Sequence, residues 1–199
     1  MMNPLILIDK YYEGQDELKH ILLTHSRQVA DRALKIVDAH PEFGADRQFV
    51  EEAAMLHDIG IVMVDAPRIF CKGSHKYIEH GYLGAELLRK EGFPKHAGVA
   101  ERHTGSGITL EQVIREELPL PPQDYCPRTI EEEIICYADK FYSKTRLGEE
   151  VPYQKVRNSI WMYGNDSVLR FDKWREKFEP ELGKWEKNRY TLVYIKKKY

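Results

Sequence analysis

The spacing of hydrophobic residues along the chain predicts helices almost throughout. Between residues 16 and 39, apolar side chains recur at steps of three and four, which is the repeat of an amphipathic helix with one buried face. The same repeat, together with typical start and stop residues, predicts further helices. They cover residues 46–58, 76–91, 94–103, 129–139, 153–163 and 166–178, with a short one opening near residue 109.

Polar residues with capping potential stand at three of the predicted helix starts. Asp46 is the predicted cap of the second helix. Thr109 with Gln112, and Thr129 with Glu132, have the spacing of a capping box, in which each side chain binds the backbone N–H of the other residue. These residues therefore predict where the helices begin.

The connections between the helices complete the predicted architecture. Gly60 lets the chain leave the second helix, and the connection over residues 61–74 is longer than a usual loop, which favours a segment that covers or shapes a site. The segment TLVYI at residues 191–195 is the one good strand candidate, but because it has no visible partner strand, a tail that packs on helices is the equal alternative. The predicted fold is an all-α helical bundle over residues 1–147, with a short C-terminal helical extension over residues 148–199 in the same globular unit.

Composition and charge favour one globular domain that handles small molecules. The chain has 199 residues, of which 42% are hydrophobic, enough to bury a core without disulfides. Its 30 Lys and Arg against 32 Asp and Glu give a net charge of −2, which argues against a nucleic-acid partner held by phosphate neutralisation. The three cysteines lack CxxC spacing, so we expect free thiols in a reducing compartment.

The N-terminal segment and the hydropathy pattern predict a cytoplasmic location. The first apolar run ends at Asp9, which is too short for a signal peptide. No stretch approaches the roughly 20 apolar residues needed to span a bilayer. We therefore expect no membrane partner, and a homodimer is left open as the assembly.

Histidines and aspartates lie on the inward faces of several predicted helices. The set consists of His25, His57, Asp58, His80, His103 and Asp139. His25, for example, lies three or four residues from Ile21, Leu22 and Val29, so it shares their buried face. Packing alone explains the set poorly, because a buried carboxylate such as Asp139 is costly without a partner. Inward imidazoles and carboxylates from several helices are how a helical bundle builds a metal centre.

The sequence around this set resembles the HD-domain phosphohydrolase superfamily, in particular its HDIG-type members. The motif HDIG is present literally at residues 57–60, and the resemblance extends from about residue 18 to residue 146. Further similar segments are IEHGYLGAELLRKEGF at residues 78–93, ERHTGSGIT at 101–109 and YADKF at 137–141. A bare HD dipeptide is uninformative, but the ordered series His, His–Asp, His, His, Asp is specific. The resemblance implies that the predicted bundle is an HD domain.

The resemblance also implies a divalent metal cofactor held in two groups of ligands. The ligands of the first ion would be His25, His57, Asp58 and Asp139. His80 and His103 match the extra histidines of dinuclear members, where they bind a second ion and the aspartate matching Asp58 bridges both. Imidazole and carboxylate ligands suit Fe, Mn, Co, Ni or Zn, and the spacing does not choose among them. We therefore expect two transition-metal ions.

The activity implied by the resemblance is hydrolysis of a small phosphate ester or anhydride, with a nucleotide as the expected substrate. A metal ion lowers the pKa of bound water toward neutrality and polarises phosphoryl oxygens. Asp58 is then a catalytic ligand, and His75, in the long connection, is the candidate general acid. The candidates for holding the substrate phosphate are Lys72, Lys76, Arg102 and Lys140.

One departure from the family and two other functions stay open. Many members carry a basic residue directly after HDIG, where this chain has Ile61 and Val62, so the phosphate contact must come from elsewhere or the substrate differs. Some proteins with the same ligands are mixed-valent di-iron oxygenases, for which Tyr11 and Tyr12 are candidates to approach the centre. A catalytically silent nucleotide-binding module is the other alternative. Its candidate interaction face consists of Trp161, Tyr163, Phe171, Trp174 and Trp185.

Overall fold

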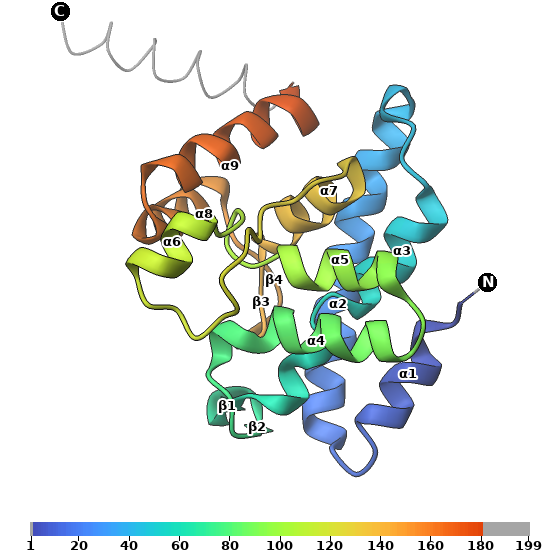
Figure 1. Cartoon of the computed structure of the whole chain (residues 1–199). Helices are drawn as coiled ribbons and strands as arrows, with labels where there is room; N and C mark the ends of the chain where they lie inside the picture. The colour runs from blue at the N-terminus through green and yellow to red at the C-terminus, as the bar shows by residue number, and fades with distance from the viewer. Residues whose placement is uncertain (1, 181–199) are drawn as a thin grey trace, which may run out of the picture.

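Helices dominate the structure of the chain, a computed structural model that describes residues 2–180 (Figure 1). The helices are α1 (Pro4–Tyr11), α2 (Asp16–Ala39), α3 (Arg47–Leu56), α4 (His80–Lys90), α5 (Pro94–Arg102), α6 (Leu110–Arg115), α7 (Ile130–Asp139), α8 (Tyr153–Ile160) and α9 (Asn165–Phe178). Two short antiparallel hairpins pair β1 (Asp65–Ala66) with β2 (Cys71–Lys72), and β3 (Tyr142–Ser143) with β4 (Arg146–Glu150). The predicted all-α class is confirmed. The strand predicted at residues 191–195 lies outside the described residues.

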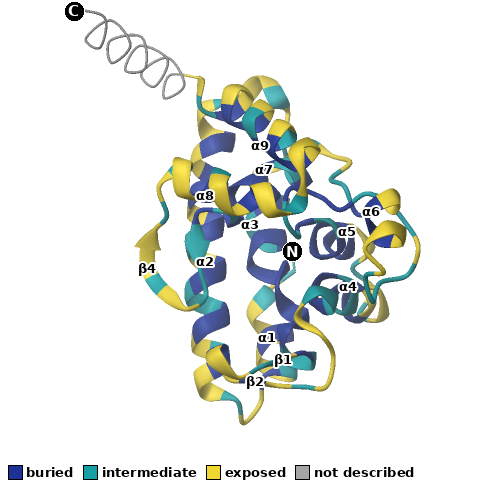
Figure 2. Ribbon diagram, turned by 90° about the vertical axis from the view of Figure 1, so that its left-hand side faces the viewer, coloured by how far each residue is buried: buried dark blue, intermediate teal, exposed yellow. Residues whose placement is uncertain are grey.

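The long helix α2 runs through the middle of the molecule and divides the core into two halves (Figure 2). Its C-terminal half packs with α3, α7 and α9, where Phe171 is fully buried. Its N-terminal half packs with α1, α4 and α5, where Leu22 and Leu88 are fully buried. Full burial of one such side chain contributes about 1.5–3 kcal/mol to stability. Segments from 148 to 180 thus share a core with the rest of the bundle.

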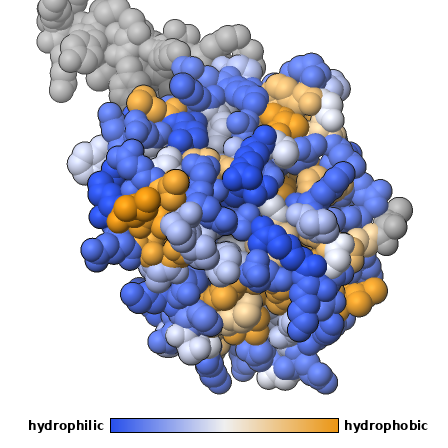
Figure 3. Space-filling view, viewed as in Figure 1, coloured by the Kyte–Doolittle hydropathy of each residue, from blue (hydrophilic) through white to orange (hydrophobic). Residues whose placement is uncertain are grey.

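One face of the molecule is mainly hydrophilic. On the face shown in Figure 3, hydrophobic side chains form small separate patches between hydrophilic ones. No helix within residues 2–180 is both long and apolar enough to cross a bilayer.

Helix α1 is the main element that the hydrophobic repeat did not predict. The side chain of Asn3 accepts a hydrogen bond from Leu5 N–H, and Pro4 occupies the first turn, so the helix start is well capped. Only Leu7 and Ile8 of this helix are buried. Eight residues with two inward side chains are too short a stretch to display a helical repeat.

Two predicted capping boxes have different outcomes. Thr109 and Gln112 form the reciprocal box at the start of α6. At the start of α7, Thr129 accepts from Glu132 N–H, but the Glu132 carboxylate binds Arg128 N–H and Arg102 instead of closing the box. A long-range ion pair therefore replaces half of the second box.

The HDIG glycine serves close packing and does not end a helix. Helix α3 ends at Leu56, and Gly60 lies within a 3-10 segment, η2 (Ile59–Met63). A Cβ atom at Gly60 would lie 2.1 Å from the backbone oxygen of His80 and 2.5 Å from Gly84 N. The prediction that Gly60 lets the chain leave the helix is wrong, because the helix has already ended at Leu56. The glycine lets η2 lie directly against α4, which carries His80.

Candidate metal centre

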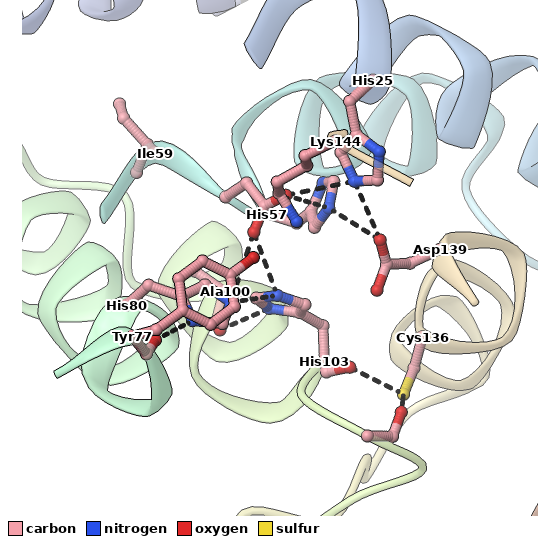
Figure 4. A network of polar contacts seen from close by, with 12 residues as sticks. His25, His57, Ile59, Tyr77, His80, Ala100, His103, Cys136, Asp139 and Lys144 are labelled. Atoms are coloured by element: carbon pink, nitrogen blue, oxygen red, sulfur yellow. Dashed lines mark hydrogen bonds and ion pairs between the residues drawn. The ribbon is translucent and has the colours of Figure 1, made fainter. Parts of the chain in front are cut away.

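Six buried side chains from five helices converge on one centre (Figure 4). His25 comes from the middle of α2, His57 and Asp58 from the residues after α3, and His80 from the start of α4. His103 follows α5, and Asp139 ends α7. Their ligand atoms form two groups that share one aspartate: His25, His57, Asp58 and Asp139, and Asp58, His80 and His103.

The first group is arranged around two carboxylate oxygens. His25 Nε2 lies 2.9 Å from Asp139 Oδ1 and 3.1 Å from Asp58 Oδ2. His57 Nε2 lies 3.1 Å from the same Asp58 oxygen and 3.4 Å from Asp139 Oδ1. Two imidazole nitrogens and two carboxylate oxygens therefore face a common point.

The second group uses the other oxygen of the shared aspartate. Asp58 Oδ1 lies 3.3 Å from His80 Nε2 and 3.3 Å from His103 Nε2. The two imidazole nitrogens are 3.0 Å apart. Asp58 thus presents one oxygen to each group, which is the arrangement of a bridging carboxylate.

Backbone carbonyls determine which nitrogen of three of the histidines faces the centre. Nδ1 lies 2.6 Å from Ala54 O in His57, 2.6 Å from Tyr77 O in His80 and 2.7 Å from Ala100 O in His103. A carbonyl oxygen only accepts, so each Nδ1 donates its hydrogen, and in the neutral ring Nε2 carries a lone pair. Each carbonyl lies three residues earlier in the chain, so the helix ends themselves set the tautomers.

The unsatisfied polar atoms of the centre fit a divalent cation. His57 Nε2 and both oxygens of Asp58 are buried and have no partner with hydrogen-bond geometry within residues 2–180, although Asp58 Oδ2 forms an ion pair with Lys144 Nζ. The Nε2 lone pairs of His80 and His103 face each other, which is unfavourable unless a cation lies between them. Imidazole nitrogen with carboxylate oxygen is a donor set for Zn, Fe, Mn, Co or Ni. The residues present are therefore suited to a metal ion in each group.

The charges in the centre reinforce this fit. Burial lowers the pKa of His103 to about 3, so its ring is neutral at pH 7. Burial also opposes a charge on His57, but the adjacent Asp58 and Asp139 outweigh it and raise the pKa of His57 to about 9. The pKa of Asp58 stays well below its usual range despite burial, because His57 and Lys144 stabilise the carboxylate. The two aspartates are therefore ionised and attract positive charge.

Two lysines border the aspartates. Lys140 Nζ lies 2.6 Å from Asp139 Oδ2 and donates to the backbone oxygen of His103 at 3.0 Å. Lys144 Nζ lies 2.6 Å from Asp58 Oδ2 and 5.9 Å from the centre of the Tyr77 ring. Lys140 was predicted as a substrate-binding residue, but Lys144 was not, because a lysine in a polar turn is usually exposed to solvent. Its position five residues after Asp139 was the available signal.

The other candidates for catalysis and substrate binding lie elsewhere. The His75 side chain is 46% exposed and pairs with Glu79. Arg102 binds Glu132 and lines a separate hollow beside α3. Lys72 and Lys76 are exposed. Among the described residues, no hydrogen bond or ion pair joins the side chains of His75, Lys72, Lys76 or Arg102 to the six converging side chains.

The tyrosines and aromatic residues considered for other functions have structural partners. Tyr12 is buried, and its hydroxyl donates to the backbone oxygen of Ile59, within the HDIG motif, at 2.8 Å. Tyr11 donates to Glu91 at the surface. Phe171 and Trp174 are buried in the core, whereas Trp161 is 69% exposed. Burial removes Phe171 and Trp174 from the predicted aromatic face. Trp185, its remaining tryptophan, lies outside the described residues.

A basic cavity adjoins the first group of ligands. It has a volume of about 520 Å³ and reaches Asp139. Its charged lining besides Asp139 is entirely positive and consists of Arg68, Lys140, Lys144, Arg146 and Lys155. The long connection over residues 61–74 contributes Arg68 to its wall. Cations thus stand beside the centre although none follows the HDIG motif directly.

Comparison with known families identifies this arrangement of helices and ligands. The HD domain matches residues 22–143, which is more than half of the chain. The chain belongs to the HD-domain family. This range contains all six converging side chains, and the helical HD fold expected from the HDIG resemblance is confirmed.

Three known proteins are similar in sequence over much of this chain. An uncharacterized protein of Methanocaldococcus jannaschii is 39% identical over 131 residues, covering 64% of this chain and 70% of that protein. A tRNA (cytidine(56)-2'-O)-methyltransferase of Picrophilus torridus is 35% identical over 177 residues, 86% of this chain and 45% of that protein. The Thermoplasma volcanium protein of the same name is 34% identical over 123 residues, which make up 61% of this chain and 32% of that protein. The chain thus spans less than half of either methyltransferase relative.

A solved structure shares the fold. The HD domain of the L. monocytogenes phosphodiesterase PgpH superimposes with a TM-score of 0.52 at 18% identity, over 90% of this chain and 98% of that one. At this identity, the likeness establishes the helical arrangement of the HD domain.

Proposed function

We propose that this HD-family protein is a metal-dependent phosphohydrolase that acts on a small phosphate ester or anhydride, with a nucleotide as the favoured substrate. The observation that carries the proposal is the position of Asp58. Its two oxygens face two separate sets of imidazole ligands at 3.1–3.3 Å, next to a cavity with five basic side chains. This combination suits a substrate whose reacting group is anionic.

The ligand assignment follows from the same contacts. His25, His57, Asp58 and Asp139 would hold one ion, and Asp58, His80 and His103 a second. When bound, such ions supply a hydroxide nucleophile at neutral pH and polarise the phosphoryl oxygens. The backbone-bonded Nδ1 atoms keep the imidazoles oriented, so little reorganisation is needed when the ligands bind.

The two lysines would act on the substrate phosphate. The pKa of Lys144 is raised well above its usual value despite burial, because Asp58 lies beside it, so the side chain stays an ammonium ion. A group held so firmly in its charged form is a poor proton donor but a good stabiliser of phosphoryl oxygens. Lys140 keeps its charge for a similar reason, with Asp139 as its partner. Together they take the place of the missing basic residue after HDIG.

A phosphate at the end of an RNA chain is a second candidate substrate. Two of the similar proteins are named as tRNA methyltransferases, and this chain matches less than half of each. The HD part of such proteins would then act on the same class of molecule as the remainder. The open, basic cavity is compatible with a phosphate presented by a larger molecule.

The test combines metal analysis with a substrate screen. The purified chain is freed of metal, reloaded with Mn, Fe, Co, Ni or Zn, and analysed for metal content and for phosphate release. Substrates are p-nitrophenyl phosphate, its bis ester, nucleoside mono-, di- and triphosphates, dinucleotides, and RNA ending in a 3' or 2',3'-cyclic phosphate. We expect two ions per chain and metal-dependent release from at least one nucleotide.

Different failures distinguish the alternatives. Bound metal without phosphate release from any substrate would favour the silent nucleotide-binding module. Oxygen consumption by the iron form without phosphate release would favour the oxygenase. Turnover of RNA ends alone would select the second candidate over free nucleotides.

A further inference from the structure

The basic cavity has an inner and an outer set of cations. Lys140 and Lys144 form the inner set, since each touches an aspartate of the metal centre at 2.6 Å. The outer set is Arg68, Arg146 and Lys155, which line the same cavity but contact no ligand residue. The outer set is therefore not needed to neutralise the carboxylates of the centre.

The outer arginines, Arg68 and Arg146, are unusual because neither has a hydrogen-bond or ion-pair partner among the described residues 2–180. Every other arginine within residues 2–180 binds a carboxylate or a backbone carbonyl. Arg32 binds Glu150, for example, and Arg157 binds Asp172. The other arginines that bind a carboxylate or a backbone carbonyl are Arg27, Arg47, Arg89, Arg102, Arg115, Arg128, Arg170 and Arg175. In a chain with more acidic than basic residues, two exposed guanidinium groups that bind no carboxylate within residues 2–180 and line one cavity form a place where an anion can bind.

Three ordered elements place the outer cations. Arg68 lies in a 3-10 turn, η3 (Pro67–Ile69), at the tip of the β1–β2 hairpin. This tip is constrained, because Phe70 has a left-handed φ of 62° and its N–H donates to Pro67 O at 3.1 Å. Arg146 begins β4 opposite Ser143, and Lys155 lies in the first turn of α8. Backbone hydrogen bonds thus fix the origin of each side chain.

We propose that Arg68, Arg146 and Lys155 form a second anion subsite, which selects substrates with a second phosphate group beside the one that is hydrolysed. Guanidinium groups bind phosphate through two parallel hydrogen bonds, which makes arginine well suited to this task. A cavity of about 520 Å³ has the size of sites that hold nucleotide-like ligands. The inference rests on the proposed function, because the first phosphate is the one placed at the metal centre.

The test compares substrates that differ in the second phosphate. The metal-loaded chain is assayed with adenosine 3',5'-bisphosphate, ADP and AMP, and kcat/KM is measured for each. We expect at least one bisphosphorylated nucleotide to exceed AMP by about tenfold or more. In the double variant Arg68→Gln, Arg146→Gln, this ratio should fall toward one. The control is Arg115→Gln, an exposed arginine paired with Glu111 on α6, which should keep the ratio.

A binding measurement separates this subsite from the hydrolytic proposal. Calorimetry with the metal-free chain should give tighter binding of the preferred bisphosphate than of AMP, and the double variant should lose this difference. The subsite is overturned if the unmodified chain binds the bisphosphate and AMP with equal affinity. It is also overturned if the double variant loses the same factor in affinity for both ligands. Arginine-dependent binding without any hydrolysis would retain the subsite and reject the phosphohydrolase. Thermal melts followed by circular dichroism check that the double variant folds. The comparison of bisphosphate with AMP in the unmodified chain tests the subsite even if the variant does not fold.

Discussion

The inner ligand centre and the outer wall of the cavity are built by opposite means. The six converging residues are buried side chains on or next to helices, and three of the four histidine rings are held by backbone carbonyls three residues earlier in the chain. The outer cations are exposed side chains on two short hairpins and the start of α8. In the proposed function, the helices would provide the chemistry, and the connections between them would provide the contacts that discriminate substrates.

The largest expected effect comes from breaking the inner centre at its shared residue. Asp58→Asn keeps the shape but removes the charge that both groups of ligands share, so the chain should lose both ions. Phosphate release should fall by about 10³-fold or more, equivalent to roughly 4 kcal/mol of barrier. Metal content by mass spectrometry and kcat/KM should fall together. Asp38→Asn, an exposed carboxylate paired with Arg47, is the matched control.

A second variant tests whether there are two ions. His103→Ala removes a ligand only from the second group, so we expect one ion per chain to remain, held by the first group. Loss of both ions from this variant, or retention of both ions in Asp58→Asn, contradicts a shared carboxylate.

The border between the two regions is probed through Lys144. Its ammonium group lies 2.6 Å from Asp58 Oδ2, so it both competes with a cation and faces the cavity. Lys144→Met should therefore strengthen metal binding while it lowers kcat, by about 10²-fold, since loss of one charged stabiliser of a transition state has that order of effect. Lys35→Met, on the exposed face of α2, is the control. Weaker metal binding in Lys144→Met would show that the lysine supports the centre structurally.

The helical frame and its ligands were largely predictable from the sequence. In α2, α5 and α7 the three- and four-residue apolar repeat placed His25, His103 and Asp139 on buried faces, because burial of one helix face is what creates that repeat. The convergence of these faces came from the family resemblance, since a repeat does not specify which helices pack together. The structure brings the six residues into contact.

The cavity wall was not predictable for physical reasons. The strands β1, β2 and β3 are two residues long, too short to show an alternating pattern. In the sequence, Arg68 and Arg146 resemble any solvated arginine. Only the structure shows that neither binds a carboxylate or a carbonyl within residues 2–180. His75 and Arg102 were predicted to face the centre because they lie close in sequence to its residues. In the structure they pair with Glu79 and Glu132 instead.

A smaller effect is expected from the packing that holds the second group of ligands. In Gly60→Ala, the new Cβ would meet the backbone oxygen of His80 at 2.1 Å, so η2 and α4 must separate. Overpacking of this kind costs about 1–3 kcal/mol, which thermal unfolding would detect. We also expect weaker binding of the second ion, since His80 moves. Full stability and unchanged metal binding would mean that the backbone adjusts without displacing the ligand.

The stability of the metal-free chain should also depend on pH. The pKa of His103 falls to about 3 on folding, so below about pH 6.5 the unfolded chain takes up a proton that the folded chain does not, and stability decreases toward acid. The pKa of His57 rises to about 9, so its contribution is complete below about pH 6.5 and is lost as the pH rises through 9. The two groups together give greatest stability near pH 6.5.

Thermal melts between pH 5 and 9 measure this optimum, where each kcal/mol corresponds to roughly 2–4 °C in Tm for a chain of this size. In His103→Gln the decline between pH 6.5 and 5 should become shallower, while the decline toward pH 9 should persist. Metal-loaded protein should lose the alkaline decline as well, because the ion replaces the proton on His57. An unchanged acid limb in His103→Gln would place the titrating group elsewhere and would weaken the assignment of a neutral, metal-ready imidazole to the buried side of the centre.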